Sequence, residues 1–223
     1  MASSAGVNTQ CHMLPSVRQS GMATGDLSLQ ERKQELVRGE LASAAWHLFG
    51  KKGYEATTVA EIAAAAGVSR RTFFRYYASK EDVLTETSDD LAEAMLAAIG
   101  GRPRDEPPLV AIRRALVPVL ESRLLLTRRS RTIIRLLRES RTLRRAMMER
   151  HALMEERLAA QLADRLGADP TRDATPALLA FITRAMMDAA FNVWYDQGRK
   201  DIAGLVAELF AILAEHTRKL PQP

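Results

Sequence analysis

Apolar residues recur at three- and four-residue intervals along most of the chain, the spacing that places them on one face of an α-helix. The first such segment, residues 30–51, stops just before Gly53, so we expect an amphipathic helix there. Similar patterns return between residues 79 and 100 and again after Pro108. The sequence therefore predicts an all-α protein.

Residues 57–80 form the segment around which we expect the rest of the chain to be organised. Thr58 and Glu61 have the spacing of a capping box, in which each side chain accepts from the other residue's backbone N–H. A short helix follows and ends at Gly67, because glycine adopts the left-handed conformation there without steric cost. The apolar positions of this helix are Val59, Ile62, Ala63 and Ala66.

A second helix is expected directly after this turn, with Ser69 as its N-cap. Phe73 and Tyr77 lie four residues apart and mark its apolar side. Two short capped helices joined by a glycine turn indicate a helix-turn-helix, the motif that inserts its second helix into the major groove of DNA.

Three arginines lie in the first turns of this second helix. Arg70 and Arg71 occupy the end that points at base edges, where a guanidinium matches the two acceptors of guanine. Arg75 lies one turn further on, within reach of a phosphate or another base. Arginines at a helix start are often simply solvated, and the helix dipole favours acids there. The complete motif nevertheless favours DNA binding.

The segment from Ala44 to Leu84 combines these features with further matching positions, which are Leu48, Phe49, Gly53, Tyr54, Thr58, Ile62, Ala63, Ala66, Gly67, Val68, Ser69, Thr72, Tyr77 and Lys80. On these residues it resembles the DNA-binding domain of the tetracycline-repressor (TetR) family of bacterial transcription regulators. The resemblance implies a homodimer that binds a palindromic operator in double-stranded DNA. It also implies a repressor that leaves the operator when a small-molecule effector enters a C-terminal helical domain.

The family pattern also implies roles for individual residues. Contacts to bases fall on Arg70 and Arg71, and contacts to the DNA backbone fall on Thr58, Ser69, Thr72, Tyr76 and Lys80. The sequence departs from the commonest family form at two positions. Phe74 stands where tyrosine is usual, which removes one hydroxyl from the backbone contacts, and Arg71 replaces a frequent glycine, which adds a group able to contact a base.

Breaks in the helical pattern divide the chain. Residues 1–29 are rich in Ser, Gly, Met and Gln and do not resemble a signal peptide, so we expect a disordered extension. Residues 30–78 form the DNA-binding domain, and an acidic connecting helix follows over 79–100. Glycines and prolines then mark a boundary, and residues 101–223 form a helical domain for ligand binding and dimerisation.

The last two predicted helices carry more apolar surface than one subunit can cover. Residues 176–195 are apolar on most of the helix circumference, and the helix after Gly198 repeats an apolar pattern. We therefore expect a homodimer through these two helices, which would present two recognition helices to successive major grooves.

Signals for an effector site are weaker. Methionines concentrate on two helices, and flexible thioethers suit a cavity for varied apolar molecules, although they also serve as core filler. Nearby aromatic residues could line the same cavity or belong to the dimer interface. The candidate ligand-binding residues are Met147, Met154, Met187, Phe191 and Trp194.

Charge changes the interpretation of one segment. The net charge is +5, but residues 31–100 hold 9 basic and 11 acidic side chains, whereas residues 101–150 hold 14 arginines and 5 acids. The DNA site is therefore indicated by its motif and not by overall charge. Three interpretations of the arginine-rich segment 123–150 stay open: a solvated face paired with acids, extra contacts to DNA backbone, and a site for an anionic effector.

The sequence favours the first of these three interpretations. The acidic connecting helix is the obvious partner, and we expect Asp89, Asp90 and Glu93 to meet some of Arg131, Arg135 and Arg138.

Composition excludes several classes of protein. The chain has no uninterrupted apolar run of the roughly 20 residues that cross a bilayer, and its single cysteine, Cys11, allows no internal disulfide. We expect a cytoplasmic protein without membrane contacts. No motif of the common nucleotide-binding, hydrolase or zinc enzymes is present, so we expect no catalytic residues, metal or cofactor. A ligand-independent architectural DNA-binding protein and a helical enzyme without familiar motifs are the alternatives.

Overall fold

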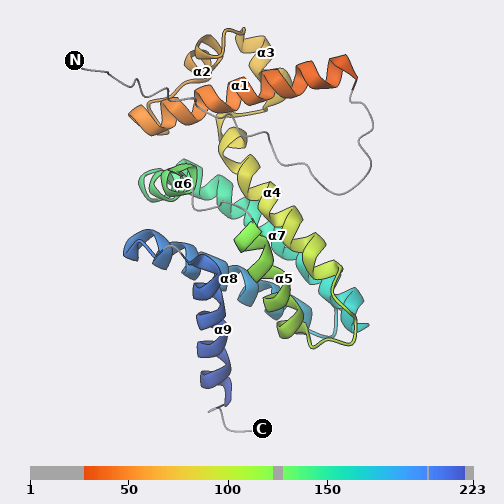
Figure 1. The fold of residues 1–223 in the computed structure, drawn as a ribbon. Helices are drawn as coiled ribbons and strands as arrows, with labels where there is room; N and C mark the ends of the chain where they lie inside the picture. The colour runs from red at the N-terminus through yellow and green to blue at the C-terminus, as the bar shows by residue number, and fades with distance from the viewer. Residues whose placement is uncertain (1–27, 123–127, 200, 219–223) are drawn as a thin grey trace, which may run out of the picture.

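The computed structural model describes residues 28–122, 128–199 and 201–218, and within them it contains nine α-helices and no strand (Figure 1). The all-α prediction is thus confirmed. The helices are α1 (Leu29–Lys52), α2 (Val59–Ala65), α3 (Arg70–Tyr76), α4 (Lys80–Gly100), α5 (Pro108–Ser122), α6 (Arg128–Glu139), α7 (Arg141–Leu166), α8 (Thr175–Gln197) and α9 (Ile202–Arg218).

Helices α1, α2, α3 and the first turn of α4 form a compact head, residues 28–84. Side-chain capping fixes where three of these helices start: Ser28, Thr58 and Ser79 each form a capping box with the residue three positions on. Ser28 caps α1 and Leu29 begins it, at the end of the predicted extension 1–29, whose boundary stays a prediction. The rest of that extension lies outside the described residues.

The head has its own apolar core. Its most deeply buried side chains come from every helix of the head. The short helices α2 and α3 and the first turn of α4 are therefore held against α1 by packing as well as by their caps. These side chains are Leu41, Phe49, Ile62, Phe73 and Leu84.

The described residues after 84 form the helical body. α4 leaves the head and runs beside α7 in the same direction, while α5 and α8 pack against them and α9 projects away toward the C-terminus (Figure 1). The body core includes Ile112, Leu116, Leu158, Leu162 and Trp194. α4 ends at Gly100, in the segment where the sequence places a boundary, and the division into domains stays a prediction.

Helix α6 contributes to the core of the head although it is far from the head in sequence. Leu136 of α6 and Leu143 of α7 are fully buried among the head's apolar residues, and Ile133 and Leu137 pack against them. The head is therefore anchored to the body at two places, through the continuous helix α4 and through the apolar face of α6.

Helix α8 is the only helix of the described residues that is long and apolar enough to span a membrane by length and composition. Its apolar residues are instead used in packing, since Met186, Ala190 and Trp194 lie in the body core. Two of its large apolar side chains lie on the surface instead, where Leu178 is 57% and Phe181 is 52% exposed.

Candidate nucleic-acid interface

The turn between α2 and α3 is built as the sequence predicts. Thr58 and Glu61 close their capping box with distances of 2.9 Å and 3.3 Å between backbone nitrogen and side-chain oxygen. Gly67 has φ of +67°, a conformation that glycine adopts without strain, and Ser69 then accepts from the backbone N–H of Thr72 at 3.0 Å. The two helices are thus locked in a fixed relative orientation.

The buried side of α3 anchors it to the head. Phe73 is completely buried and Tyr77, which caps the helix, is 3% exposed. Their ring centroids lie 5.7 Å apart, and both pack in the same apolar core as Ile62 of α2. Because this side is fixed, the opposite side of α3 must face away from the protein.

That outer side carries the predicted base-contacting residues. Arg70, Arg71 and Phe74 are exposed, and neither Arg70 nor Arg71 makes a hydrogen bond or ion pair within the described part of the chain. Two guanidinium groups at the start of a short, rigidly mounted helix are therefore free to meet base edges, the geometry that a recognition helix requires.

Arg75 and Tyr76 form a pair at the other end of α3. The Arg75 guanidinium lies 5.1 Å from the centre of the Tyr76 ring and donates to its hydroxyl at 3.3 Å. Both groups are at the surface, so the pair presents a cation and a hydroxyl side by side. This combination suits a phosphate more than a base.

Lys80 is placed differently from a free phosphate ligand. Its ammonium group donates to the carbonyl oxygens of Tyr54 at 2.9 Å and Thr57 at 3.0 Å, and it lies 4.0 Å from the centre of the Tyr54 ring. These contacts tie the start of α4 to the turn that precedes α2. Its contact with DNA remains a prediction, and the observed contacts are all within the head.

Tyr54 itself is held from two sides. Its hydroxyl donates to Glu81 in the first turn of α4, while its ring packs near Phe49. Burial raises the pKa of the Tyr54 hydroxyl, and the hydrogen bond to Glu81 adds to this effect. The tyrosine thus stays protonated at neutral pH and acts as a structural donor.

A second polar group joins α1, α3 and α4. The Glu86 carboxylate accepts hydrogen bonds from Nε of Arg38 at 2.6 Å and from the hydroxyl of Tyr77 at 2.9 Å. The Arg38 guanidinium also lies 4.8 Å from the centre of the Tyr77 ring. Burial raises the pKa of Tyr77, with Glu86 as the next cause. The end of the recognition helix is therefore tied directly to the connecting helix.

Next to this contact lies a hollow of about 510 Å³ between the head and the body. Five carboxylates of α4 line it, together with Arg38 and Arg150. A surface of this sign repels DNA phosphates, so the hollow itself does not suit a contact with DNA. The carboxylates are Asp82, Glu86, Asp89, Asp90 and Glu93.

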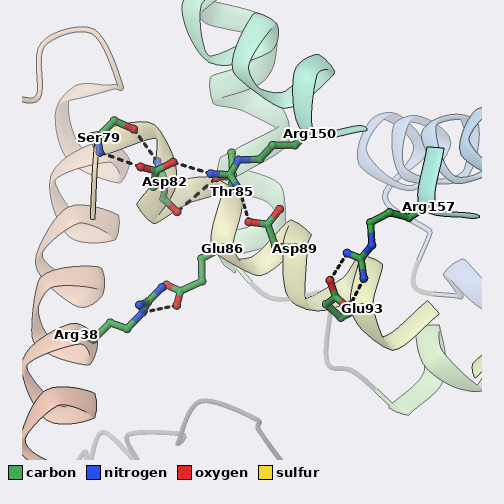
Figure 2. Close-up of polar contacts among 9 residues, drawn as sticks. All are labelled: Arg38, Ser79, Asp82, Thr85, Glu86, Asp89, Glu93, Arg150 and Arg157. Carbon is green, nitrogen blue, oxygen red and sulfur yellow. Dashed lines mark hydrogen bonds and ion pairs between the residues drawn. The ribbon is translucent and has the colours of Figure 1, made fainter. Parts of the chain in front are cut away.

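The acids of α4 pair with arginines of α7 (Figure 2). Arg150 binds Asp82 at 2.6 Å and also contacts Asp89, and Arg157 binds Glu93 with one nitrogen–oxygen distance of 2.9 Å. The predicted pairing of Asp89 and Glu93 with arginines of α6 is therefore wrong. α4 runs along α7, and this places the α7 arginines on its acidic face.

The arginines of α6 have other partners. Arg138 pairs with Asp196 at 2.6 Å, and the Arg131 guanidinium lies 5.2 Å from the Trp194 ring centre. Arg135 pairs with Glu139 at 3.5 Å. In Figure 1, α6 lies on the opposite side of α1 from α2 and α3. Arg131 and Arg138 therefore lie against the end of α8, whereas Arg135 also donates to the carbonyl oxygen of Gly50 in α1 at 3.4 Å.

The candidate ligand-binding residues occupy the body. Met187 and Trp194 are 6% and 2% exposed in its core, and Met154 and Phe191 are partly buried against that core. Met147 is buried as well, at 4% exposed. Their grouping around an effector stays a prediction.

One polar cluster was not recognised from the sequence. Arg184 of α8 bridges Asp188, at 2.5 Å, and Glu155 of α7, and His151 lies close to all three charges. Burial lowers the pKa of His151. The signal in the sequence was the polar strip on α8, whose partners on α7 only the packing of the two helices reveals.

Comparison with known proteins agrees with this geometry. A family model described as bacterial regulatory proteins of the tetR family matches residues 41–87, which contain α2, α3 and the start of α4. A second model, described as the MftR C-terminal domain, matches residues 106–218.

Curated relatives match over most of their length. The chain is 34% identical over 197 residues to the HTH-type transcriptional regulator TcmR of Streptomyces glaucescens, covering 86% of each protein. It is 27% identical to a protein of Mycobacterium tuberculosis named as a mycofactocin biosynthesis transcriptional regulator, MftR, covering 86% of this chain and 96% of the relative.

Among solved structures, the chain has the fold of native NalD, a repressor of a multidrug efflux pump in Pseudomonas aeruginosa. The TM-score is 0.59 at 22% identity, over 82% of this chain and 96% of that one.

Proposed function

The chain belongs to the tetR family of bacterial regulatory proteins, and from this premise we propose that it binds a palindromic operator as a homodimer and is released by a small molecule. The observation that carries this proposal is the pair of exposed guanidinium groups of Arg70 and Arg71 on a helix whose other side is buried. A recognition helix needs both properties at once, because its side chains must reach bases while its backbone stays fixed.

The residues of the interface divide into two groups by their surroundings. Arg70 and Arg71 contact bases, since they are exposed and have no partner in the described structure. The remaining residues contact or position the DNA backbone, because they lie at helix caps, further along the recognition helix or at the start of α4. These are Thr58, Ser69, Thr72, Arg75, Tyr76 and Lys80.

Dimerisation is proposed through α8 and α9. Leu178 and Phe181 lie three residues apart on α8 and are more than half exposed, and Ile212 of α9 is 52% exposed. Exposed large apolar side chains on two helices that pack against each other support a protein interface. A two-fold axis through these helices presents two heads to one face of the DNA.

The effector is proposed to enter the body near α7 and α8, where Met154 and Phe191 are only partly buried. The polar cluster of His151, Arg184 and Asp188 on the same two helices offers groups for orienting a ligand.

Selection of binding sites from random double-stranded DNA tests the proposal. We expect a palindrome, bound by a particle with twice the mass of the chain. Enrichment of a single half-site bound by a monomer, or of no sequence, contradicts it. A library of small molecules can then be screened for release of the selected site, with Arg71→Ala as a binding-deficient control.

A further inference from the structure

Helices α4 and α7 are joined by polar contacts at regular intervals. Arg150 and Arg157 of α7 bind acids of α4, as described above, and Gln161 donates to the carbonyl oxygen of Leu96 at 3.0 Å. Arg165 continues the series beyond the end of α4 by donating to the carbonyl oxygen of Arg102 at 3.1 Å. We call this series the α4–α7 ladder. Because the two helices run in the same direction, the ladder fixes how far one is shifted along the other.

The first contact of the ladder lies at the start of α4. One oxygen of Asp82 accepts from the backbone N–H of Ser79 at 2.8 Å and thereby caps the helix, while the other accepts from Arg150 at 2.6 Å (Figure 2). Ser79 follows the last residue of α3, Tyr76, by three positions. A side chain of the body therefore holds the turn that leads directly out of the recognition helix.

Arg150 holds α4 at two points, at its start and two turns further on. Its second nitrogen contacts Asp89, which lies seven residues after Asp82 and therefore on the same face of α4, about 10 Å further along the helix. A planar guanidinium that binds two carboxylates at once restrains rotation as well as translation of the helix, whereas an ammonium group would act as a single point of charge.

Charge makes this contact more important than an isolated surface pair. Asp82 and Asp89 line the acidic hollow together with Glu86, and Arg150 is one of the two cations that line it. The side chains of Arg150 and Asp82 are 33% and 27% exposed, so solvent screens them only in part. Without Arg150, the carboxylates of the first turns of α4 repel one another and the start of the helix is no longer held against α7.

The head would nevertheless stay attached. Leu136 of α6 is buried in the core of the head, and Ser140 at the start of α7 donates to Glu55 of the head at 2.5 Å. Loss of Arg150 therefore loosens the direction in which the head points and does not detach it.

We propose that Arg150 is a positioning residue for operator recognition, which sets the direction of α3 relative to the body and thereby the spacing of half-sites that the dimer accepts. This proposal rests on the proposed function, because a spacing exists only for a dimer on a palindrome. Arg150 itself does not touch DNA.

The experiment measures affinity on a series of operators whose half-sites are moved apart or together one base pair at a time. Each base pair shifts a half-site by about 3.4 Å and rotates it by about 35° around the duplex axis, so a rigid dimer loses contacts quickly. The proteins are the full chain, Arg150→Met, Arg150→Lys and Asp89→Asn. Arg157→Met is the matched control, because Arg157 belongs to the same ladder but lies away from the start of α4.

For the unchanged protein and Arg157→Met we expect a sharp optimum, with a loss of about tenfold or more for one added base pair, since this breaks the contacts of one half-site. For Arg150→Met we expect weaker binding at the optimum and a loss of only about threefold at the neighbouring spacings, because the heads can now adjust. Arg150→Lys and Asp89→Asn should fall between these limits, since each leaves one of the two contacts.

Three results overturn the proposal. If Arg150→Met and Asp89→Asn keep the spacing profile of the unchanged protein, Arg150 does not position the heads. If both variants weaken binding by the same factor at every spacing, the contact between Arg150 and Asp89 has only a structural role. An unchanged protein that binds no palindrome, or binds every spacing equally, overturns the proposed function and this inference with it. Thermal unfolding shows which variants are folded. If Arg150→Met does not fold, the test uses Asp89→Asn, which leaves the Asp82 cap intact.

Discussion

The guanidinium of Arg138 in α6 donates two hydrogen bonds to the carboxylate of Asp196 at the end of α8, with nitrogen–oxygen distances of 2.6 Å and 2.9 Å. This hydrogen-bonded pair lowers the pKa of Asp196. Arg138 also lies 4.6 Å from the centre of the Tyr195 ring. Arg138 therefore has an acidic partner within the protein, as the first of the three interpretations of the sequence expects. The pair connects α8 to α6, the helix that contributes Leu136 to the core of the head.

Base recognition can be separated from backbone contact by mutation. Arg70→Ala and Arg71→Ala should each relax the base preference at one position per half-site by about 1 to 3 kcal/mol, because each removes a guanidinium that reads a base edge. The measurement is a comparison of affinities for the selected operator and its single-base variants. Equal losses on the operator and on random DNA would contradict the assignment to bases.

Lys80 should affect every DNA sequence alike. Lys80→Met removes the donor for the carbonyl oxygens of Tyr54 and Thr57, so we expect a lower melting temperature together with uniformly weaker DNA binding. Lys52→Met is the control, since Lys52 pairs with Glu61 at the surface and such pairs contribute about 0 to 1 kcal/mol. A Lys80 variant with full stability and altered base preference would show that this role is wrong.

The core of the head should depend on a residue of the body. Leu136→Ala is expected to lower the free energy of unfolding by about 2 to 5 kcal/mol, because it leaves a cavity where a fully buried side chain belongs to the apolar core of the head. Leu153→Ala, at an exposed position of α7 outside the proposed dimer interface, serves as the control. Urea unfolding monitored by tryptophan fluorescence provides the measurement, and equal stability of both variants would refute the shared core.

Self-association should be lost when the apolar surface of α8 becomes charged. Phe181→Glu places a carboxylate in the proposed dimer interface, and burying it without a partner is costly, so we expect a monomer in light-scattering measurements. Leu153→Glu changes an equally exposed leucine on α7 and should leave the dimer intact. If Phe181→Glu still forms a dimer and Leu153→Glu does not, the interface lies on another face.

The connection between α4 and α5 should respond to acid. Glu106 accepts both Arg102 nitrogens at 2.8 Å and Arg114 at 2.6 Å, and the contact with Arg102 is the main cause that lowers its pKa from 4.5 to about 2. Because the pKa of Glu106 is lower in the folded protein than its ordinary value, its ion pairs stabilise the folded protein at pH values above that ordinary pKa.

This stabilisation is lost as the pH falls from about 4.5 toward about 2. We therefore expect Glu106→Gln to melt at a lower temperature than the unchanged protein at neutral pH, with a difference that shrinks below pH 4.5. A difference in melting temperature that is constant down to pH 2.5 would contradict this role of the carboxylate.

The sequence by itself determined the features that depend on neighbouring residues. The caps at Thr58 and Ser69 and the turn at Gly67 are set by hydrogen bonds and backbone conformation within a few positions, so their outcome could be predicted directly. The outward placement of Arg70 and Arg71 followed from the buried spacing of Phe73 and Tyr77.

Only the tertiary structure decided which charges meet. Asp89 pairs with Arg150 and not with the arginines of α6, because α7 lies along α4 while α6 crosses to the head and to the end of α8. Leu136 likewise joins a core made mainly of side chains from residues 41–84, far before it in the sequence. Helical periodicity shows that a side chain is apolar or charged and on which face it lies, but its partner is fixed by how whole helices pack, through contacts between residues far apart in the chain.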